Sequence, residues 1–228
     1  MSLSTKTDGN PAINRSIPWL AIVSGLLGLC SFVSLIAYIT TPAIQMQDSG
    51  AVPPVGQRLL AIQFLSSAAQ VLMMIPVAIG LYRIEGRRLA GAGSRGLGIA
   101  WVVLGVVAFA GVGLLRLAAM VDPALSDILF MLPMGLVGVW LIGVNWKNAV
   151  ALPGWMRILG GVAGIGLAGV GLNFLFNGGM AVFSKDPMAY GNDVNFHIGL
   201  GLFGFPGFTL FAIWSLLLGL RYLRTPAL

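Results

Sequence analysis

Long apolar runs constrain this chain more than any other feature of its sequence. A helix needs about 20 apolar residues to cross the roughly 30 Å of hydrocarbon in a bilayer, and runs of that length recur along the chain. Only 9% of the residues are charged, whereas a soluble domain usually carries about 25%. Because so few charges cannot cover the surface of a globule of this size, the sequence predicts an integral membrane protein.

The apolar runs predict about six spans. In hydrocarbon, only helices and closed barrels satisfy the backbone hydrogen bonds, and these runs are far longer than the roughly ten-residue alternating strands of a barrel. We therefore expect an all-α polytopic transmembrane bundle in one domain, residues 18–224, after a polar tail at residues 1–17. The predicted spans are residues 18–40, 59–82, 96–118, 123–146, 154–176 and 195–222.

The basic residues predict the orientation of these spans. With a cytoplasmic N-terminus, the inner side carries ten Lys and Arg residues and the outer side only Arg58, Arg116 and Lys185. Cytoplasmic loops are enriched in basic residues, so we predict a plasma-membrane protein with both termini cytoplasmic. The chain has a net charge of +6, and its basic residues lie at span ends, where they can contact anionic headgroups. No basic run is interleaved with aromatic residues, so we predict the bilayer as a partner and no nucleic acid.

An internal repeat is one interpretation of recurring short patterns. Leu-x-x-x-Pro occurs in the even-numbered spans, ending at Pro76, Pro133 and Pro206. Residues 110–114 and 168–172 both read Ala-Gly-Val-Gly-Leu. These matches indicate three repeated helical hairpins, as weak internal symmetry is common in membrane folds. The alternative is chance, because Leu, Gly and Val are abundant in this chain.

Two Gly-x-Gly-x-x-Gly matches, at residues 164–169 and 199–204, lie inside apolar spans. A dinucleotide fingerprint needs a preceding strand and a helix N-terminus in water, and neither is expected here. Small residues let helices approach closely in a bilayer. We therefore interpret both matches as helix-packing surfaces, either within one chain or between copies. The three span prolines each remove a backbone hydrogen bond, and kinks at similar depth would open a cavity on one side of the bundle.

Arg116, near the end of its span, is the central residue of the candidate site. A charge at that depth is usually paired or reaches the headgroups. A tight hairpin places Asp122 and Asp127 within its reach. The pair is interpreted either as a structural ion pair or as a site for an anionic or zwitterionic headgroup or solute.

Other polar residues on the outer side extend this hypothesis. Asn173 and Asn177 share a helix face, and Asn195 and His197 begin the last span. With Gln63 and Gln70, they are candidates to line one outward-facing polar pocket. The candidate ligand-binding residues are Arg58, Arg116, Asp122, Asp127, Asn173, Asn177, Asn195 and His197.

His197, the only histidine, lies four residues after Asp193. Together they form either a base with its orienting carboxylate or two metal ligands. The alternative is that Asn192 or Asp193 caps the last span and that His197 packs at the membrane interface. A metal site would need a third ligand from elsewhere, such as Asp127. Because no catalytic, metal-binding or nucleotide-binding motif is recognisable, we predict no metal, no cofactor and no catalytic residue.

One segment resembles known proteins. A span that ends Val-Trp-Leu-Ile-Gly at residues 139–143 is followed by Leu-Pro-Gly-Trp-Met-Arg-Ile-Leu-Gly at residues 152–160. These residues resemble a loose group of uncharacterised bacterial six-span integral membrane proteins of unknown function. The resemblance covers about two spans and implies a membrane fold but no activity.

The sequence leaves three functions open. The first is non-enzymatic binding or passage of a small or amphiphilic ligand through the outward-facing pocket. The second is a structural or accessory subunit whose Gly-rich faces pack against a homo-oligomer or a membrane-complex partner. The third is a membrane-embedded enzyme built on Asp193, His197, Asp127 and Asn177, which lacks a nucleophile beside a base. Proton- or sodium-driven transport is disfavoured, because the mid-membrane zone offers amides rather than ionisable groups.

Overall fold

The computed structural model is all-helical over the residues that it describes. These are residues 16–42, 53–85, 92–118, 120, 123–146, 152–177 and 194–224. The helices are α1 (Ser16–Thr40), α2 (Pro54–Glu85), α3 (Ala92–Leu117), α4 (Pro123–Leu129), α5 (Met131–Trp146), α6 (Gly154–Phe176) and α9 (Val194–Arg224). Most of the polar N-terminal tail lies outside the described residues. The predicted all-α class is confirmed.

The helices match the predicted spans closely. Five described helices, namely α1, α2, α3, α6 and α9, are long and apolar enough to cross a membrane. The predicted span at residues 123–146 is built from two consecutive helices, α4 and the short apolar α5. The chain is therefore a helical membrane bundle of about six spans.

The break between α4 and α5 falls at Phe130 and has a local cause. Pro133 has no backbone N–H to donate to the carbonyl oxygen of Leu129. The flanking bonds persist, since the N–H of Phe130 donates to Ser126 at 3.0 Å and that of Met134 to Phe130 at 3.2 Å. Pro76 and Pro206, by contrast, lie within the continuous helices α2 and α9. Of the three predicted kinks, only the one at Pro133 interrupts its helix.

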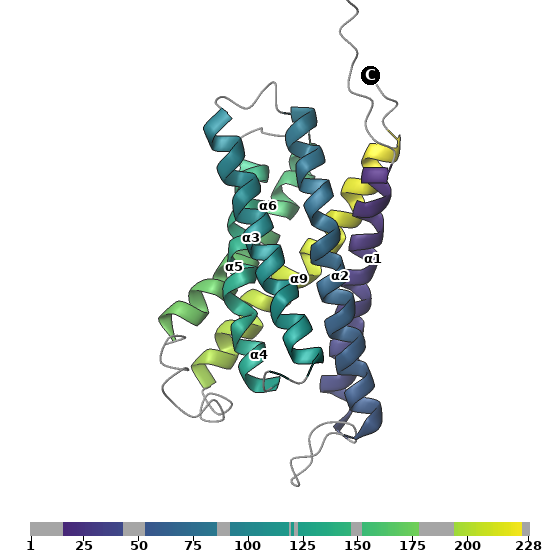
Figure 1. Ribbon diagram of the computed structural model, residues 1–228, viewed down its shortest axis with the longest axis vertical. Helices are drawn as coiled ribbons and strands as arrows, with labels where there is room; N and C mark the ends of the chain where they lie inside the picture. Colours follow the sequence, from purple (N-terminus) through teal and green to yellow (C-terminus); the bar gives the residue numbers. More distant parts are fainter. Residues whose placement is uncertain are drawn as a thin grey trace, which may run out of the picture.

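The helices form a closed ring in chain order. Each span packs against the next, with α1 against α2, α2 against α3, α3 mainly against α5, and α5 against α6. The helix α9 closes the ring by packing against both α6 and α1. Figure 1 shows that α9 crosses the bundle obliquely, from the lower left to the upper right. The start of α1 and the end of α9 lie together at the upper end of the bundle.

Glycines set the close approach of α5, α6 and α9. A Cβ atom on Gly135 would lie 2.8 Å from the Cα atom of Gly171, and one on Gly166 would lie 2.6 Å from the Cα atom of Gly207. A Cβ atom on Gly164 would lie 2.8 Å from the backbone nitrogen of Ile142. These backbones are too close for any larger residue. The glycines of the first Gly-x-Gly-x-x-Gly match thus pack within the chain, as small residues do in bilayers.

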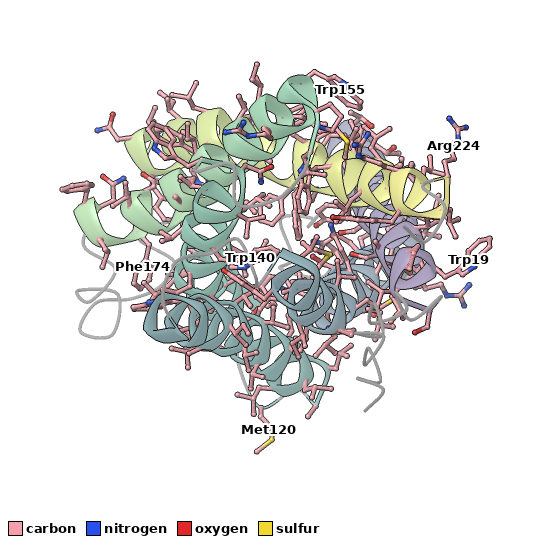
Figure 2. All side chains as sticks on the ribbon, turned by 90° about the horizontal axis from the view of Figure 1, so that it is seen from above. Trp19, Met120, Trp140, Trp155, Phe174 and Arg224 are labelled. Carbon is pink, nitrogen blue, oxygen red and sulfur yellow. The ribbon has the colours of Figure 1, made fainter. Side chains whose placement is uncertain are left out.

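The interior of the ring holds large buried side chains. Trp140 of α5 and Trp214 of α9 meet edge to face with ring centroids 6.4 Å apart. In Figure 2, Trp140 lies inside the ring, while Trp19, Trp155 and Met120 project from its periphery. Phe211, Met74 and several aliphatic residues complete the buried core around the two tryptophans.

The glycines shared by the proposed repeat differ in their surroundings. Gly169 and Gly171 of α6 lie against Phe203 and Gly135, respectively. Their counterparts on α3 are looser, since a Cβ atom on Gly111 would have no neighbour within 4 Å and one on Gly113 would be 3.7 Å from Ala68. The order of the helices in the ring is compatible with a hairpin repeat. The corresponding glycines of α3 and α6 do not have similar packing, however, so the repeat stays a prediction.

Candidate ligand-binding site

The oblique course of α9 separates it from α1 at one end of the bundle. Gly25 and Gly28 of α1 pack against Leu216 and Ala212, in the C-terminal half of α9. The N-terminal half of α9 packs instead against α6, for example where the Asn173 amide donates to the carbonyl oxygen of Phe196 at 3.1 Å. The two helices therefore diverge toward the end of the bundle where α1 ends and α9 begins.

A cavity of about 480 Å³ occupies this end of the bundle. Its volume falls within the roughly 300–1,000 Å³ range of small-molecule sites. Most of its wall is apolar. The lining residues are Phe32, Leu35, Tyr38, Ile39, Leu60, Gln63, Phe64, Ser67, Phe109, Arg116, Phe130, Met131, Val170, His197, Leu200, Gly201, Gly204, Phe205 and Phe208.

Arg116 supplies the permanent charge of the cavity wall. It lies in the last turn of α3, and its Cζ atom is 3.6 Å from the centroid of the Phe64 ring on α2. Its Nη1 atom donates a hydrogen bond of 2.8 Å to the hydroxyl oxygen of the buried Ser126 on α4. These contacts, a cation–π interaction and a charge-assisted hydrogen bond, hold the guanidinium at the junction of three helices.

His197 brings a second polar group to the same cavity from α9. Its ring meets that of Phe196 edge to face, with centroids 5.6 Å apart. Gln63 of α2 and Tyr38 of α1 also line the cavity. Arg116, His197 and Gln63, which the sequence hypothesis assigned to one pocket, thus share a cavity, whereas Tyr38 was not among the candidates.

Gly201 is a glycine of the cavity wall rather than of a helix contact. A Cβ atom there would meet nothing within 4 Å. The packing interpretation of the second Gly-x-Gly-x-x-Gly match thus has no intrachain partner at this position, and packing between copies here stays a prediction. It holds at Gly199, where a Cβ atom would collide with the side chain of Asn173.

The asparagines of α6 connect helices and do not line the cavity. The side chain of Asn173 is buried and spans from α6 to the backbone of α9. Its carbonyl oxygen accepts a hydrogen bond from the side-chain amide of Asn177, which follows the last residue of α6. Asn173 is thus used by the α6–α9 contact, and neither asparagine is among the residues that line the cavity with Arg116 and His197.

Gln70 is also turned away from the cavity. It is only 4% exposed, and a Cβ atom on Gly28 would collide with its side-chain amide. Its backbone oxygen accepts a hydrogen bond of 2.9 Å from the Ser24 hydroxyl. Its Nε2 atom has no hydrogen-bond partner among the described residues.

The remaining candidate residues either do not line the cavity or lie outside the part of the chain that the structure describes. Arg58 and Asn195 are exposed in the first turns of α2 and α9, and neither lines the cavity. Asp122 and the side chain of Asp127 lie outside the described part of the chain, as does Asp193. Their predicted pairing with Arg116 and His197 stays a prediction. Within the described residues, no three His, Cys, Asp or Glu side chains are grouped to hold a metal ion.

Fold and cavity together define a multi-pass helical membrane protein with a largely apolar cavity at one end, whose wall also carries a few polar groups. Comparisons with known protein families, with curated proteins and with solved structures give no match to this chain.

Proposed function

We propose that this protein binds a small or amphiphilic ligand, without chemical transformation, in the cavity beside Arg116. The single observation that carries the proposal is a cavity of about 480 Å³ whose wall is largely apolar and contains one guanidinium. A concave apolar site with a few convergent polar groups is the usual form of a ligand pocket. An ionisable group within a membrane domain is costly and is commonly functional.

The same proposal includes an outward-facing cavity in a plasma-membrane protein with cytoplasmic termini. The cavity lies at the end of the bundle opposite the start of α1 and the end of α9. The basic residues support this orientation, because ten of the thirteen belong to the side that carries the termini. Exposed Trp19, Trp146 and Trp155 also lie near helix ends on that side, where interfacial tryptophans anchor helices.

Photolabelling tests whether a ligand enters the cavity. The probe is a small neutral phenyldiazirine, applied to the protein in vesicles, and the readout is the residue that carries the adduct. Phe64, Phe109 and Phe130 are buried and line the cavity, so they are labelled only by a probe inside it. We expect adducts on these phenylalanines in the wild type and their loss in Gly201→Trp, where a side chain starts in open space at the wall.

Gly143→Trp is the matched control. A Cβ atom on Gly143 of α5 also meets nothing within 4 Å, and this glycine is exposed and does not line the cavity. The control should keep the wild-type adducts. Wild-type protein without adducts on the buried phenylalanines would overturn the proposed function.

The accessory-subunit alternative is left with a smaller surface. Gly164 and Gly169 of α6, on which it was based, are occupied by packing against α5 and α9. Gly111 of α3 retains open space beside it. Gly161 of α6 also retains open space, so a surface for partners or further copies of the chain is proposed at Gly111 and Gly161 rather than at Gly164 and Gly169.

A further inference from the structure

Aromatic rings are concentrated on the wall of the cavity. Six of the chain's twelve phenylalanines line it. Phe64 of α2, Phe130 at the α4–α5 break and Phe109 of α3 form a row of three rings, in which the centroid of Phe130 lies 5.1 Å from that of Phe64 and 4.6 Å from that of Phe109. All three side chains are buried. The protein therefore places a continuous aromatic surface along one part of the cavity.

A second group of rings lines the cavity from α1 and α9. Phe32 of α1 meets Phe205 of α9 edge to face, with ring centroids 4.8 Å apart. Phe208, three residues further along α9, also lines the cavity. A molecule in the cavity is therefore surrounded by aromatic rings from α1, α2, α3 and α9. Such rings favour partners that stack on them or meet them edge to face.

The helix α2 adds hydrogen-bonding groups to the same part of the wall. Gln63 and Ser67 both line the cavity, and side chains four residues apart share a helix face. Ser67 is only 4% exposed. Because Gln63 directly precedes Phe64 and Ser67 lies one turn further into the helix, the polar groups of α2 lie beside the aromatic row. A ligand that uses both has its polar atoms close to its ring.

The polar groups of α2 favour an uncharged ligand. An amide and a hydroxyl both donate and accept hydrogen bonds and carry no charge. The Arg116 guanidinium, by contrast, is engaged by the Phe64 ring and the Ser126 hydroxyl. Burying a charge in an apolar site costs far more than burying a hydrogen-bonded neutral group. A neutral oxygen on the ligand therefore suits this wall.

We propose that the ligand is an uncharged planar ring compound that carries a hydrogen-bonding oxygen, as phenols and quinones do. Its ring lies against the row of Phe64, Phe130 and Phe109, and its oxygen bonds to Ser67 or Gln63. This inference rests on the proposed binding function and specifies its ligand class. An apolar cavity of about 150 Å³ binds benzene, so a cavity of about 480 Å³ has room for a fused two-ring compound.

Three competitors of one carbon skeleton test the inference in vesicles that contain the full-length protein. They are 2-naphthol, its saturated analogue decahydro-2-naphthol, and 2-methylnaphthalene, which lacks the oxygen. Each is added at the same membrane concentration, and the readout is the loss of phenyldiazirine adducts on Phe64, Phe109 and Phe130. We expect 2-naphthol to compete about fivefold better than either of the others, because an aromatic contact and a neutral hydrogen bond each correspond to a factor of roughly 2–13.

Variants of α2 and α3 locate the recognition. Gln63→Leu combined with Ser67→Ala should remove the advantage of 2-naphthol over 2-methylnaphthalene. Ser66→Ala is the matched control, since Ser66 is also buried on α2 but does not line the cavity, and it should keep the full advantage. Phe109→Leu should bring 2-naphthol closer to decahydro-2-naphthol. An unchanged advantage of 2-naphthol in the double variant would overturn the assignment to α2.

The wild-type comparison does not depend on any variant. Equal competition by 2-naphthol and decahydro-2-naphthol would overturn the planar ring, and equal competition by 2-naphthol and 2-methylnaphthalene would overturn the oxygen. Stronger competition by the anion 2-naphthoate than by 2-naphthol would overturn the uncharged class and assign recognition to Arg116.

The failure of this inference is distinguishable from that of the proposed function. If the phenyldiazirine labels the buried phenylalanines but no naphthalene compound displaces it, ligand binding stands and the ring compound is overturned. If the phenyldiazirine does not reach these phenylalanines, both proposals are overturned together.

Discussion

The guanidinium of Arg116 lies over the ring of Phe64, with its Cζ atom 3.6 Å from the ring centroid. This contact joins the end of α3 to the first half of α2 at the cavity wall. A cation–π contact contributes about 0.5–1 kcal/mol when exposed and about 2 kcal/mol or more when desolvated. Because Arg116 is only half-buried, we expect a value inside that range.

A double-mutant cycle measures this contact. Phe64→Leu and Arg116→Leu, alone and together, should show a coupling free energy of about 0.5–2 kcal/mol in unfolding experiments in mixed micelles. Phe109→Leu is the matched control, since Phe109 is also buried and packs against Phe130 at 4.6 Å between centroids. Strictly additive effects of Phe64→Leu and Arg116→Leu would contradict the prediction.

The α6–α9 contact predicts a strong position dependence for substitutions of glycine. Gly166→Val should prevent the close approach to Gly207, because its Cβ atom would lie 2.6 Å from a backbone carbon atom. Overpacking of this kind costs about 1–3 kcal/mol or more. The readout is the thermal unfolding midpoint in mild detergent. Gly161→Val, in the same helix but with no neighbour within 4 Å of a Cβ atom, should be close to the wild type.

Replacing Gln70 with an apolar residue of similar shape should stabilise the protein. Its Nε2 atom is buried without a partner among the described residues, and an unsatisfied buried polar group costs about 1–3 kcal/mol. Gln70→Met keeps the unbranched shape and removes that group, so the unfolding midpoint should rise. Ser24→Ala serves as a comparison, because it removes only the hydroxyl that donates to the Gln70 backbone. A lower midpoint for Gln70→Met would show that the amide has a partner, such as a buried water.

Replacing Pro133 should make the helix continuous across the break between α4 and α5. Pro133→Ala supplies the missing N–H donor, so a hydrogen bond to the carbonyl oxygen of Leu129 can form across the break at Phe130. Hydrogen exchange of the segment from Ser126 to Met134 should therefore slow. Because Phe130 lines the cavity, its photolabelling should change as well. Pro206→Ala, within the continuous α9, should alter exchange without joining two helices, and unchanged exchange around Phe130 would refute the proposed cause.

The helices could be predicted well because hydrocarbon thickness and backbone satisfaction leave few alternatives. The predicted span at residues 154–176 coincides with α6 (Gly154–Phe176). The helix α2 (Pro54–Glu85) extends beyond its predicted span at both ends, because a helix can continue past the apolar core into the polar interface. The break in the fourth span depends on one proline among three, and sequence pattern does not distinguish Pro133 from Pro76 and Pro206.

The cavity was predictable only in part. Arg116 and His197 were identifiable because ionisable groups near hydrocarbon are rare. The orientation of the side-chain amides could not be predicted. An asparagine such as Asn173 occupies the same kind of sequence position whether it faces a ligand or bonds to the backbone of a neighbouring helix. The phenylalanines that form most of the wall, such as Phe32 and Phe208, are indistinguishable in sequence from lipid-facing or core residues. Gly201 resembled a packing glycine because its neighbours Gly199 and Gly204 share its spacing.

The closure of the ring by α9 has a consequence for biogenesis. Helices emerge from the ribosome in order, so α1 to α6 enter the bilayer while the partner for Gly25, Gly28 and Gly166 is still being synthesised. The native assembly cannot be completed until residues near the C-terminus have been translated. A chain that stops before α9 therefore leaves the glycines of α1 and α6 that face α9 without their packing partner.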